Sequence, residues 1–126
     1  MKGREQRRTE RIQARFLVEF GPTEPCFPGE VRDVSLHGLF VQTRRQSTVG
    51  SLIRLRLYVP DGDTPFDCYA WVRFCDIKRS GGMGLELFAM SYAESTRWGT
   101  YYYRCVAAGR KQARAQAAQA HAAVAA

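Results

Sequence analysis

Apolar side chains recur at every second position in two stretches of the chain, residues 14–20 and 52–59. The apolar positions of these stretches are Phe16, Val18, Phe20, Ile53, Leu55, Leu57 and Val59. Successive side chains of a β-strand point to opposite faces, so this alternation predicts two half-buried strands. Residues 66–77 predict the longest strand, in which Trp71 and Arg73 point outward. Its predicted inward positions are Ala70, Val72 and Phe74.

Three shorter segments complete the strand pattern, at residues 29–33, 39–41 and 83–88. Stretches rich in turn residues, such as residues 21–25 and 60–63, separate the strands. Six short strands at this spacing are typical of a sandwich or a small barrel. Closing a sheet into a barrel removes its exposed edges. We therefore predict a mainly β fold, a six-stranded antiparallel β-barrel.

A helical pattern follows the last strand. Ser91 and Glu94 have the S-x-x-E spacing of a capping box, which predicts the start of a C-terminal α-helix. The residues that recur at helical spacing, and that we expect to pack on the barrel, are Trp98, Tyr102, Cys105 and Gly109. Residues 110–126 are mostly Ala and Gln with little to bury, and we expect a frayed helix or a disordered tail. Residues 1–11 are predicted to form a flexible basic arm, and residues 12–109 the barrel and helix.

Composition limits the class of protein. The chain has 126 residues, 45% hydrophobic and 25% charged, as is ordinary for one globular domain. No apolar run approaches the roughly 18 residues of a membrane span. The N-terminus is charged and does not resemble a secretory signal. We expect a cytoplasmic monomer without membrane insertion.

The net charge of +7 is concentrated at the two ends of the chain. Residues 1–15 hold six Lys or Arg against Glu5 and Glu10, and residues 104–126 hold four and no acid. Nucleic-acid-binding proteins usually spread basic side chains over one folded face. The distribution here favours a small anionic ligand bound by an N-terminal arm. Basic ends that only keep the protein in solution are the alternative.

Catalytic and metal sites find little support. The four cysteines, Cys26, Cys68, Cys75 and Cys105, include no C-x-x-C pair, and there are two histidines, so we expect free buried thiols and no metal site. Asp33, Ser35 and His37 lie within five residues of one chain, whereas a catalytic triad needs groups from separate elements. The glycines of residues 81–84 lack the Lys-Ser/Thr ending of a phosphate loop. We expect no enzyme.

Two short motifs carry ligand-binding chemistry. The first is an arginine run at residues 7–11, and the second is Asp-Val-Ser-Leu-His-Gly at residues 33–38. Arginine binds planar, acceptor-rich groups such as phosphates and the O6/N7 edge of guanine through paired hydrogen bonds. A carboxylate can accept the N–H donors of guanine's other edge. A ligand that contains both phosphates and guanines would use all of these groups.

Three R-x-x-x-R spacings overlap near the N-terminus: Arg4 with Arg8, Arg7 with Arg11, and Arg11 with Arg15. We choose Arg7 with Arg11, because Arg11 directly precedes the first alternating strand. Arg8 is a third candidate contact. Arg15 lies inside the predicted strand and is rejected as a motif residue.

The second motif conflicts with a regular strand. Asp33 and Ser35 share one face of an extended chain, and Val31, a candidate core residue, has the same parity. A β-bulge near Arg32 would resolve the conflict, and bulges often redirect side chains at binding sites. Gly38 would supply either a positive φ or a close approach of backbones.

Together the two motifs resemble the signature of the PilZ family, R-x-x-x-R followed by [D/N]-x-S-x-x-G. The resemblance covers about residues 5–105 and implies a PilZ-like split barrel that acts as a bacterial cyclic di-GMP receptor. An aromatic side chain on the strand of residues 66–77 sometimes lines the ligand in this family, so Trp71 is a candidate for stacking on guanine. The ligand-binding residues that we predict are Arg7, Arg8, Arg11, Asp33, Ser35, Gly38 and Trp71.

The resemblance implies a receptor that orders its arm around cyclic di-GMP and signals to an effector protein controlling motility, pili or exopolysaccharide. An interaction module that acts without nucleotide is the main alternative. A barrel that binds single-stranded nucleic acid is a third possibility, which a low number of exposed aromatics among basic residues would disfavour.

Overall fold

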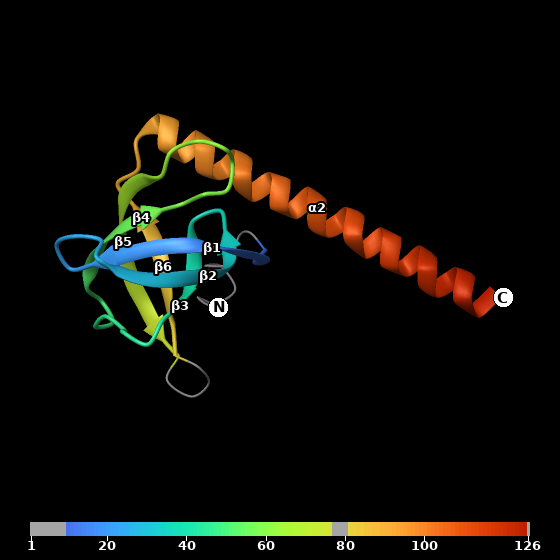
Figure 1. The fold of residues 1–126 in the computed structure, drawn as a ribbon, viewed down its shortest axis with the longest axis horizontal. Helices are drawn as coiled ribbons and strands as arrows, with labels where there is room; N and C mark the ends of the chain where they lie inside the picture. The colour runs from blue at the N-terminus through green and yellow to red at the C-terminus, as the bar shows by residue number, and fades with distance from the viewer. Residues whose placement is uncertain (1–9, 77–80, 126) are drawn as a thin grey trace, which may run out of the picture.

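The structure is a computed structural model that describes residues 10–76 and 81–125 of the chain. Figure 1 shows a barrel with one long helix leading away from it. The strands are β1 (Ile12–Gly21), β2 (Phe27–Ser35), β3 (Gly38–Gln42), β4 (Leu52–Leu57), β5 (Phe66–Cys75) and β6 (Met83–Phe88). The helix is α2 (Tyr92–Ala125).

The six strands of the described residues form a closed antiparallel barrel. They are hydrogen-bonded in the order β1-β2-β3-β6-β5-β4, and β1 pairs with β4 to complete the ring. The fold predicted from the sequence, a six-stranded antiparallel β-barrel with a C-terminal helix, is confirmed. The ring places β1, β2 and β3 side by side. Arg11 directly precedes β1, Asp33 and Ser35 lie on β2, and Gly38 begins β3.

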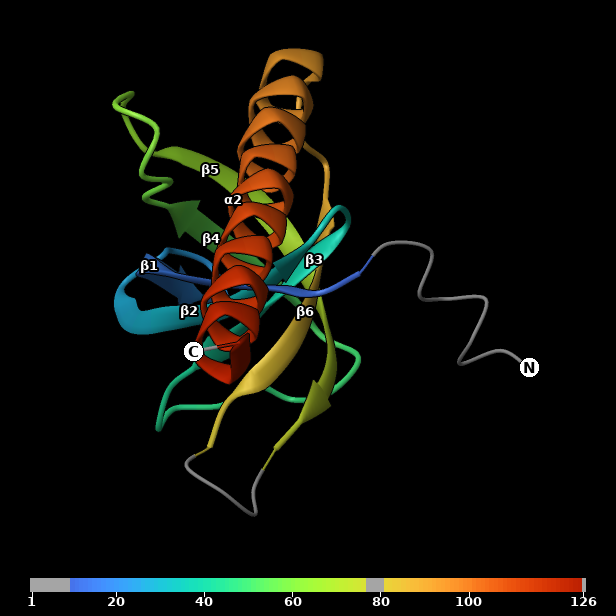
Figure 2. The ribbon, with the colours of Figure 1, turned by 90° about the vertical axis from the view of Figure 1, so that its right-hand side faces the viewer.

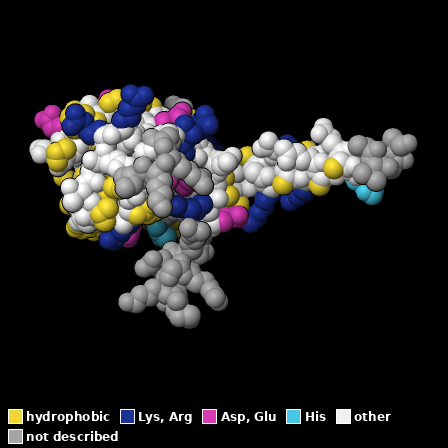
Figure 3. Space-filling model, turned by 90° about the horizontal axis from the view of Figure 1, so that it is seen from below, with side chains coloured by type: hydrophobic (Ala, Val, Ile, Leu, Met, Phe, Trp, Pro, Cys, Tyr) yellow, Lys and Arg dark blue, Asp and Glu magenta, His cyan; other side chains and the backbone are white. Residues whose placement is uncertain are grey.

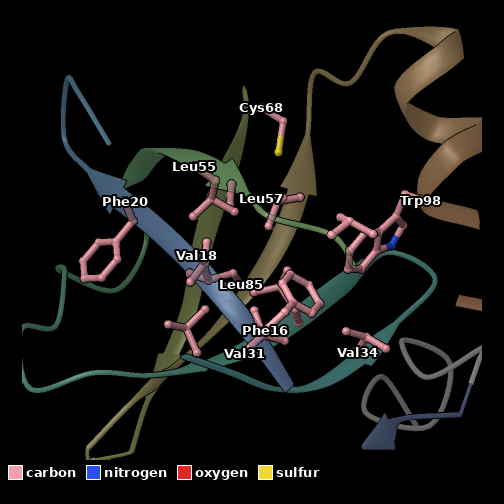
Figure 4. Packing of buried hydrophobic residues seen from close by; sticks show 14 of the residues in the cluster. Phe16, Val18, Phe20, Val31, Val34, Leu55, Leu57, Cys68, Leu85 and Trp98 are labelled. Carbon is pink, nitrogen blue, oxygen red and sulfur yellow. The ribbon is translucent and has the colours of Figure 1, made fainter. Parts of the chain in front are cut away.

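The interior of the barrel is filled by one apolar cluster to which every strand contributes (Figure 4). Three residues of α2 join the cluster, namely Trp98, Tyr102 and Val106, each at most 7% exposed. Burial of a large apolar side chain contributes roughly 1.5–3 kcal/mol to stability. The first turns of α2 are therefore part of the core, and they fix the helix against the strands that carry the motifs.

The predicted packing positions of α2 are confirmed for Trp98 and Tyr102, and Cys105 is partly buried. Gly109 does not pack on the barrel, because no atom lies within 4 Å of where a Cβ would be. Val106, which the helical pattern had not included, takes the last core position instead.

The predicted bulge in β2 is confirmed. Val31 pairs with Val41 of β3, but Asp33 pairs with Phe40, so Arg32 is an extra residue on β2. Val31 is fully buried, whereas Asp33 stays on the outer surface. Because of this extra residue, Val31 and Asp33 point to opposite faces of the sheet although they stand two positions apart in the sequence.

A second bulge makes the prediction for Phe74 wrong. The register of β5 against β6 shifts between Val72 and Phe74, so the alternation reverses there. Phe74 is 44% exposed on the outer surface, with its ring 6.1 Å from that of Phe40. Beneath it lies Gly84, where a Cβ would come 2.1 Å from the Phe74 ring.

The predicted capping box at the start of α2 is confirmed. The Ser91 amide donates to the Glu94 carboxylate at 3.0 Å, and the Glu94 amide donates to the Ser91 hydroxyl at 3.1 Å. The helix continues to Ala125, and residues 107–122 are exposed at every position (Figure 1). Fraying or disorder of this tail in solution stays a prediction.

Candidate ligand-binding site

Arg11 and Asp33 are brought together by the pairing of β1 with β2. Arg11 directly precedes β1, and Asp33 pairs with Gln13 two residues further on. Arg11 Nε lies 3.6 Å from Asp33 Oδ1, and both side chains are partly exposed. At that distance the two groups attract each other as charges, but they do not form a hydrogen bond.

Asp33 Oδ1 is shielded from solvent and accepts no hydrogen bond from any described residue. A buried acceptor left without a donor costs roughly 1–3 kcal/mol. The side chain as a whole is 30% exposed, so a molecule on the surface can reach the carboxylate. The structure thus leaves this carboxylate partly exposed, with one of its oxygens without a hydrogen bond from the described residues.

Ser35 and Gly38 flank the turn between β2 and β3. Ser35 Oγ donates to the Gly38 carbonyl oxygen at a long 3.4 Å. A Cβ on Gly38 would come 2.4 Å from the Leu85 carbonyl oxygen of β6, so this position excludes any side chain. Of the two roles considered for Gly38, the structure therefore supports the close approach of backbones.

The turn that carries Ser35 is held from two sides. The Trp98 indole N–H of α2 lies 3.2 Å from the Ser35 carbonyl oxygen and 3.1 Å from that of Leu36. On the opposite side, the Leu87 amide of β6 donates to the His37 carbonyl oxygen at 2.9 Å. The sequence pattern identified Trp98 as a core residue but missed this role. The signal available was that a buried indole N–H usually finds an acceptor.

Trp71 lies on the same outer face as Gly38 but does not adjoin it. Gly38 pairs with Glu86 of β6, and Glu86 pairs with Trp71 of β5, so Glu86 stands between them. Arg73 pairs with Glu86 at 2.6 Å, and its guanidinium lies 5.9 Å from the Trp71 ring. The structure does not bring Trp71 into contact with Arg11 or Asp33, and its stacking role stays a prediction.

The outer face of β4, β5 and β6 also carries more aromatic surface than we expected. Tyr69 and Phe88 are 37% and 48% exposed, and Phe88 packs against Trp71. Arg54 lies over the Tyr69 ring at 5.6 Å. The expectation of few exposed aromatics among basic residues is therefore wrong.

Arg7 and Arg8 lie outside the described residues, which begin at Glu10. Glu10 is tied to α2, since Tyr102 Oη donates to its carbonyl oxygen at 2.7 Å and Arg110 lies 3.6 Å from its carboxylate. Figure 2 shows α2 passing over the barrel near the start of β1. A cleft of about 540 Å³ lies between this segment and the helix. Of the first motif, the described residue Arg11 thus lies beside Asp33 of the second motif.

Other site types find no support within the described residues. No group of three or more His, Cys, Asp or Glu there could hold a metal ion. The four cysteines are free, but only Cys68 is fully buried, and burial raises the pKa of its thiol to about 12. Cys26 is exposed, so the expectation that all four thiols are buried is wrong. No helix of the described chain is long and apolar enough to cross a membrane.

Solved structures of similar fold support the architecture. The Bacillus subtilis inhibitor of motility MotI/DgrA matches with a TM-score of 0.65 at 22% identity, over 78% of this chain and 50% of that chain. YcgR of Escherichia coli in complex with c-di-GMP matches with a TM-score of 0.59 at 15% identity, over 91% and 50%. The PilZ domain of CeSA from a cellulose-synthesizing bacterium matches with a TM-score of 0.53 at 17% identity, over 71% and 90%.

At these identities the likeness concerns the fold, and this chain spans half the length of the MotI/DgrA and YcgR chains. No curated protein matches the sequence. The family model of the PilZ domain matches residues 5–104, which include both motifs and all six strands of the barrel. The chain therefore belongs to the PilZ domain family.

Proposed function

We propose that this protein is a non-catalytic receptor for cyclic di-GMP. The observation that carries the proposal is the carboxylate of Asp33, which has an unpaired, shielded oxygen beside Arg11 at the end of the barrel. Guanine offers adjacent N–H donors on one edge and two acceptors on the other. Membership of the PilZ family and the c-di-GMP named in the YcgR structure support this ligand over other guanine compounds.

Each candidate residue has a distinct proposed role. Arg7, Arg8 and Arg11 bind the phosphates and the O6/N7 edge of a guanine through their planar forks. Asp33 accepts guanine N–H groups. Ser35 donates a hydrogen bond to a phosphate or a base. Gly38 has no side chain that would block the ligand, and Trp71 stacks on the second guanine.

We also propose that ligand binding is passed on to an effector protein. In this proposal the arm of residues 1–11 becomes ordered around the ligand, because residues before Ile12 offer little apolar surface to order it alone. The inhibitor of motility among the similar structures supports an output in motility, and pili or exopolysaccharide remain the other candidates. In the same proposal the protein acts in the cytoplasm as a monomer.

Backbone relaxation of residues 3–10, with and without ligand, measures the proposed ordering of the arm. We expect slower internal motion with cyclic di-GMP bound. Equal rigidity in the two states would contradict the proposal.

Calorimetric titration tests the ligand directly and gives affinity and stoichiometry together. Cyclic di-GMP should bind, cyclic di-AMP should bind more weakly, and a random oligonucleotide should show no saturable binding. The oligonucleotide is a necessary arm because Tyr69 and Trp71 lie beside Arg54 and Arg73, as in single-strand binding surfaces. If no cyclic dinucleotide binds, the interaction module that acts without nucleotide becomes the better account.

A further inference from the structure

The charges of α2 beyond its first two turns are all positive. No Asp or Glu follows Glu94 in the chain, and the basic residues of this part of the helix are Arg104, Arg110, Lys111 and Arg114. All four side chains are exposed. Figure 3 shows dark blue side chains along one edge of the helix where it leaves the barrel. No acidic side chain of the helix balances these four charges.

The four basic side chains lie on a side of α2 that the barrel does not cover. An α-helix turns by about 100° per residue, so residues 104, 110, 111 and 114 fall within a sector of about 120°. The helix residues buried in the core, Trp98, Tyr102 and Val106, occupy a separate sector whose centre is about 140° away. We call the four residues the basic face, and it is open to a partner.

The basic face has little to bind within the described part of the chain. Arg110 lies 3.6 Å from the Glu10 carboxylate, but the two side chains are 68% and 58% exposed, and such pairs contribute little to stability. The other three basic residues form no ion pair with a described residue. Arg110 and Arg114 are four positions apart, where like charges destabilise a helix. An anionic partner would remove this repulsion.

One aromatic side chain shares the sector of the basic face. Tyr103 precedes Arg110 by seven positions, is 57% exposed, and packs against the Tyr102 ring with 5.0 Å between centroids. Tyrosine is enriched where proteins meet the headgroups of a membrane, because its ring is apolar and its hydroxyl is polar. Over residues 103–122 the sector otherwise holds Ala107, Ala118, His121 and Ala122. It therefore has no large aliphatic side chain to anchor the helix in a groove of another protein.

We propose that the basic face of α2 is a docking surface for an anionic phospholipid membrane. The helix lies along the membrane surface, its basic side chains donate to lipid phosphates, and Tyr103 enters the headgroup layer. Clusters of four or more basic residues on one helix are typical of anionic lipid recognition. The four charges extend over about 15 Å of a straight axis, which suits a flat array of phosphates.

The proposed attachment is peripheral, because the face has too little apolar surface to insert into the acyl chains. It goes beyond the proposed function and does not depend on cyclic di-GMP. Sedimentation of the full chain with vesicles tests it. The probes are vesicles of phosphatidylcholine alone and vesicles that contain about one third phosphatidylglycerol. We expect binding only to the anionic vesicles, and release in about 1 M salt, where charges are screened beyond about 3 Å.

Two triple variants with the same net charge locate the binding surface. The helix variant uses glutamine, which retains helix propensity, and combines Arg110→Gln, Lys111→Gln and Arg114→Gln. The control removes three exposed charges from the barrel and combines Arg15→Gln, Arg44→Gln and Arg45→Gln. We expect the helix variant to bind anionic vesicles at least about tenfold more weakly, and the control to stay within about threefold of wild type. Circular dichroism and the thermal unfolding midpoint check that both variants fold.

Three results would overturn the inference. Equal binding by the two triple variants would mean that net charge, and not the helix, drives association. Failure of the wild type to bind anionic vesicles would leave an acidic protein surface as the better partner for the basic face. Release from the vesicles by duplex DNA at the same phosphate concentration would assign the face to nucleic acid. None of these results bears on the calorimetric titration with cyclic di-GMP, so failure of the proposed function is detected separately.

Discussion

Two Asp–Arg pairs of this protein are built in opposite ways. Arg97 of α2 donates two hydrogen bonds to Asp61 in the loop after β4, at 2.6 and 2.8 Å, and the Asp63 amide adds a third at 3.2 Å. Arg11 and Asp33 are 3.6 Å apart, with one carboxylate oxygen unpaired. The protein saturates the first carboxylate with hydrogen bonds and leaves one oxygen of the second without a hydrogen bond from the described residues.

The difference also appears in burial and in titration. The Asp61 and Arg97 side chains are 11% and 18% exposed, and the Arg97 guanidinium lies 5.1 Å from the Phe66 ring. Hydrogen bonding from Arg97 is the largest cause that lowers the pKa of Asp61, from 3.8 to about 2. The two pairs therefore differ in hydrogen bonding and in burial, and the proposed function uses only the pair that lacks hydrogen bonds.

The largest expected effect is the loss of the saturated pair. Arg97→Ala should lower the free energy of unfolding by about 1.5–3 kcal/mol, because Asp61 loses charge-assisted hydrogen bonds in an enclosed position. Urea denaturation at pH 7 measures the change. The matched variant Arg11→Ala should change stability by less than about 0.5 kcal/mol. Equal destabilisation by the two variants would remove the distinction between the pairs.

The pH dependence of stability should follow the same pair. Because the folded pKa of Asp61 is depressed to about 2, its contribution of about 2 kcal/mol is present above pH 4 and is lost as the pH falls from about 4 to 2. The stability difference between wild type and Asp61→Asn should therefore shrink over this window. A constant difference from pH 7 to pH 2 would contradict the assignment.

The open carboxylate should matter for binding and hardly for stability. Asp33→Ala should weaken cyclic di-GMP binding by about 1–3 kcal/mol, roughly ten- to a hundredfold, because guanine donors lose their acceptor. The unfolding free energy should not fall, because the loss of the attraction to Arg11 is offset by the removal of a buried acceptor that lacks a donor. The variant should also lose much of the preference for cyclic di-GMP over cyclic di-AMP. If it keeps the full preference, the arginines discriminate between the bases.

The smallest of these effects on binding concerns the planar pair of N–H donors on the Arg11 guanidinium. Arg11→Lys retains the charge but lacks the planar pair of donors, so it should recover only part of the affinity that Arg11→Ala loses. We expect a residual deficit of about 1 kcal/mol, measured by calorimetry. Wild-type affinity in the lysine variant would mean that Arg11 interacts with the ligand only through its charge.

Much of the fold was predictable, because alternation in sequence reports directly on which face of a strand is buried. Even the bulge of β2 was predictable, since Val31 and Asp33 could not otherwise share one parity. The bulge that exposes Phe74 produced no such conflict in the sequence, because a phenylalanine is plausible on the inner or the outer face of a barrel strand. Bulges are visible in sequence only when they separate residues of clearly different kinds.

The site was less predictable, because its decisive contacts join segments far apart in the chain. The reason for glycine at position 38 is the carbonyl oxygen of Leu85 on β6, a strand that pairs with β3 but is distant from it in sequence. The acceptors of the Trp98 indole are more than sixty residues away in sequence.

The helix α2 has a practical consequence for measuring the size of this protein. Its 34 residues span about 50 Å, whereas a compact chain of this length has a radius of gyration of about 14 Å. Because the far half of the helix extends away from the barrel, a single chain experiences more friction than a sphere of its 14.3 kDa (Figure 1). A monomer should therefore elute early from a gel-filtration column and resemble a dimer. Light scattering, which measures mass independently of shape, is the method that separates an elongated monomer from a true pair.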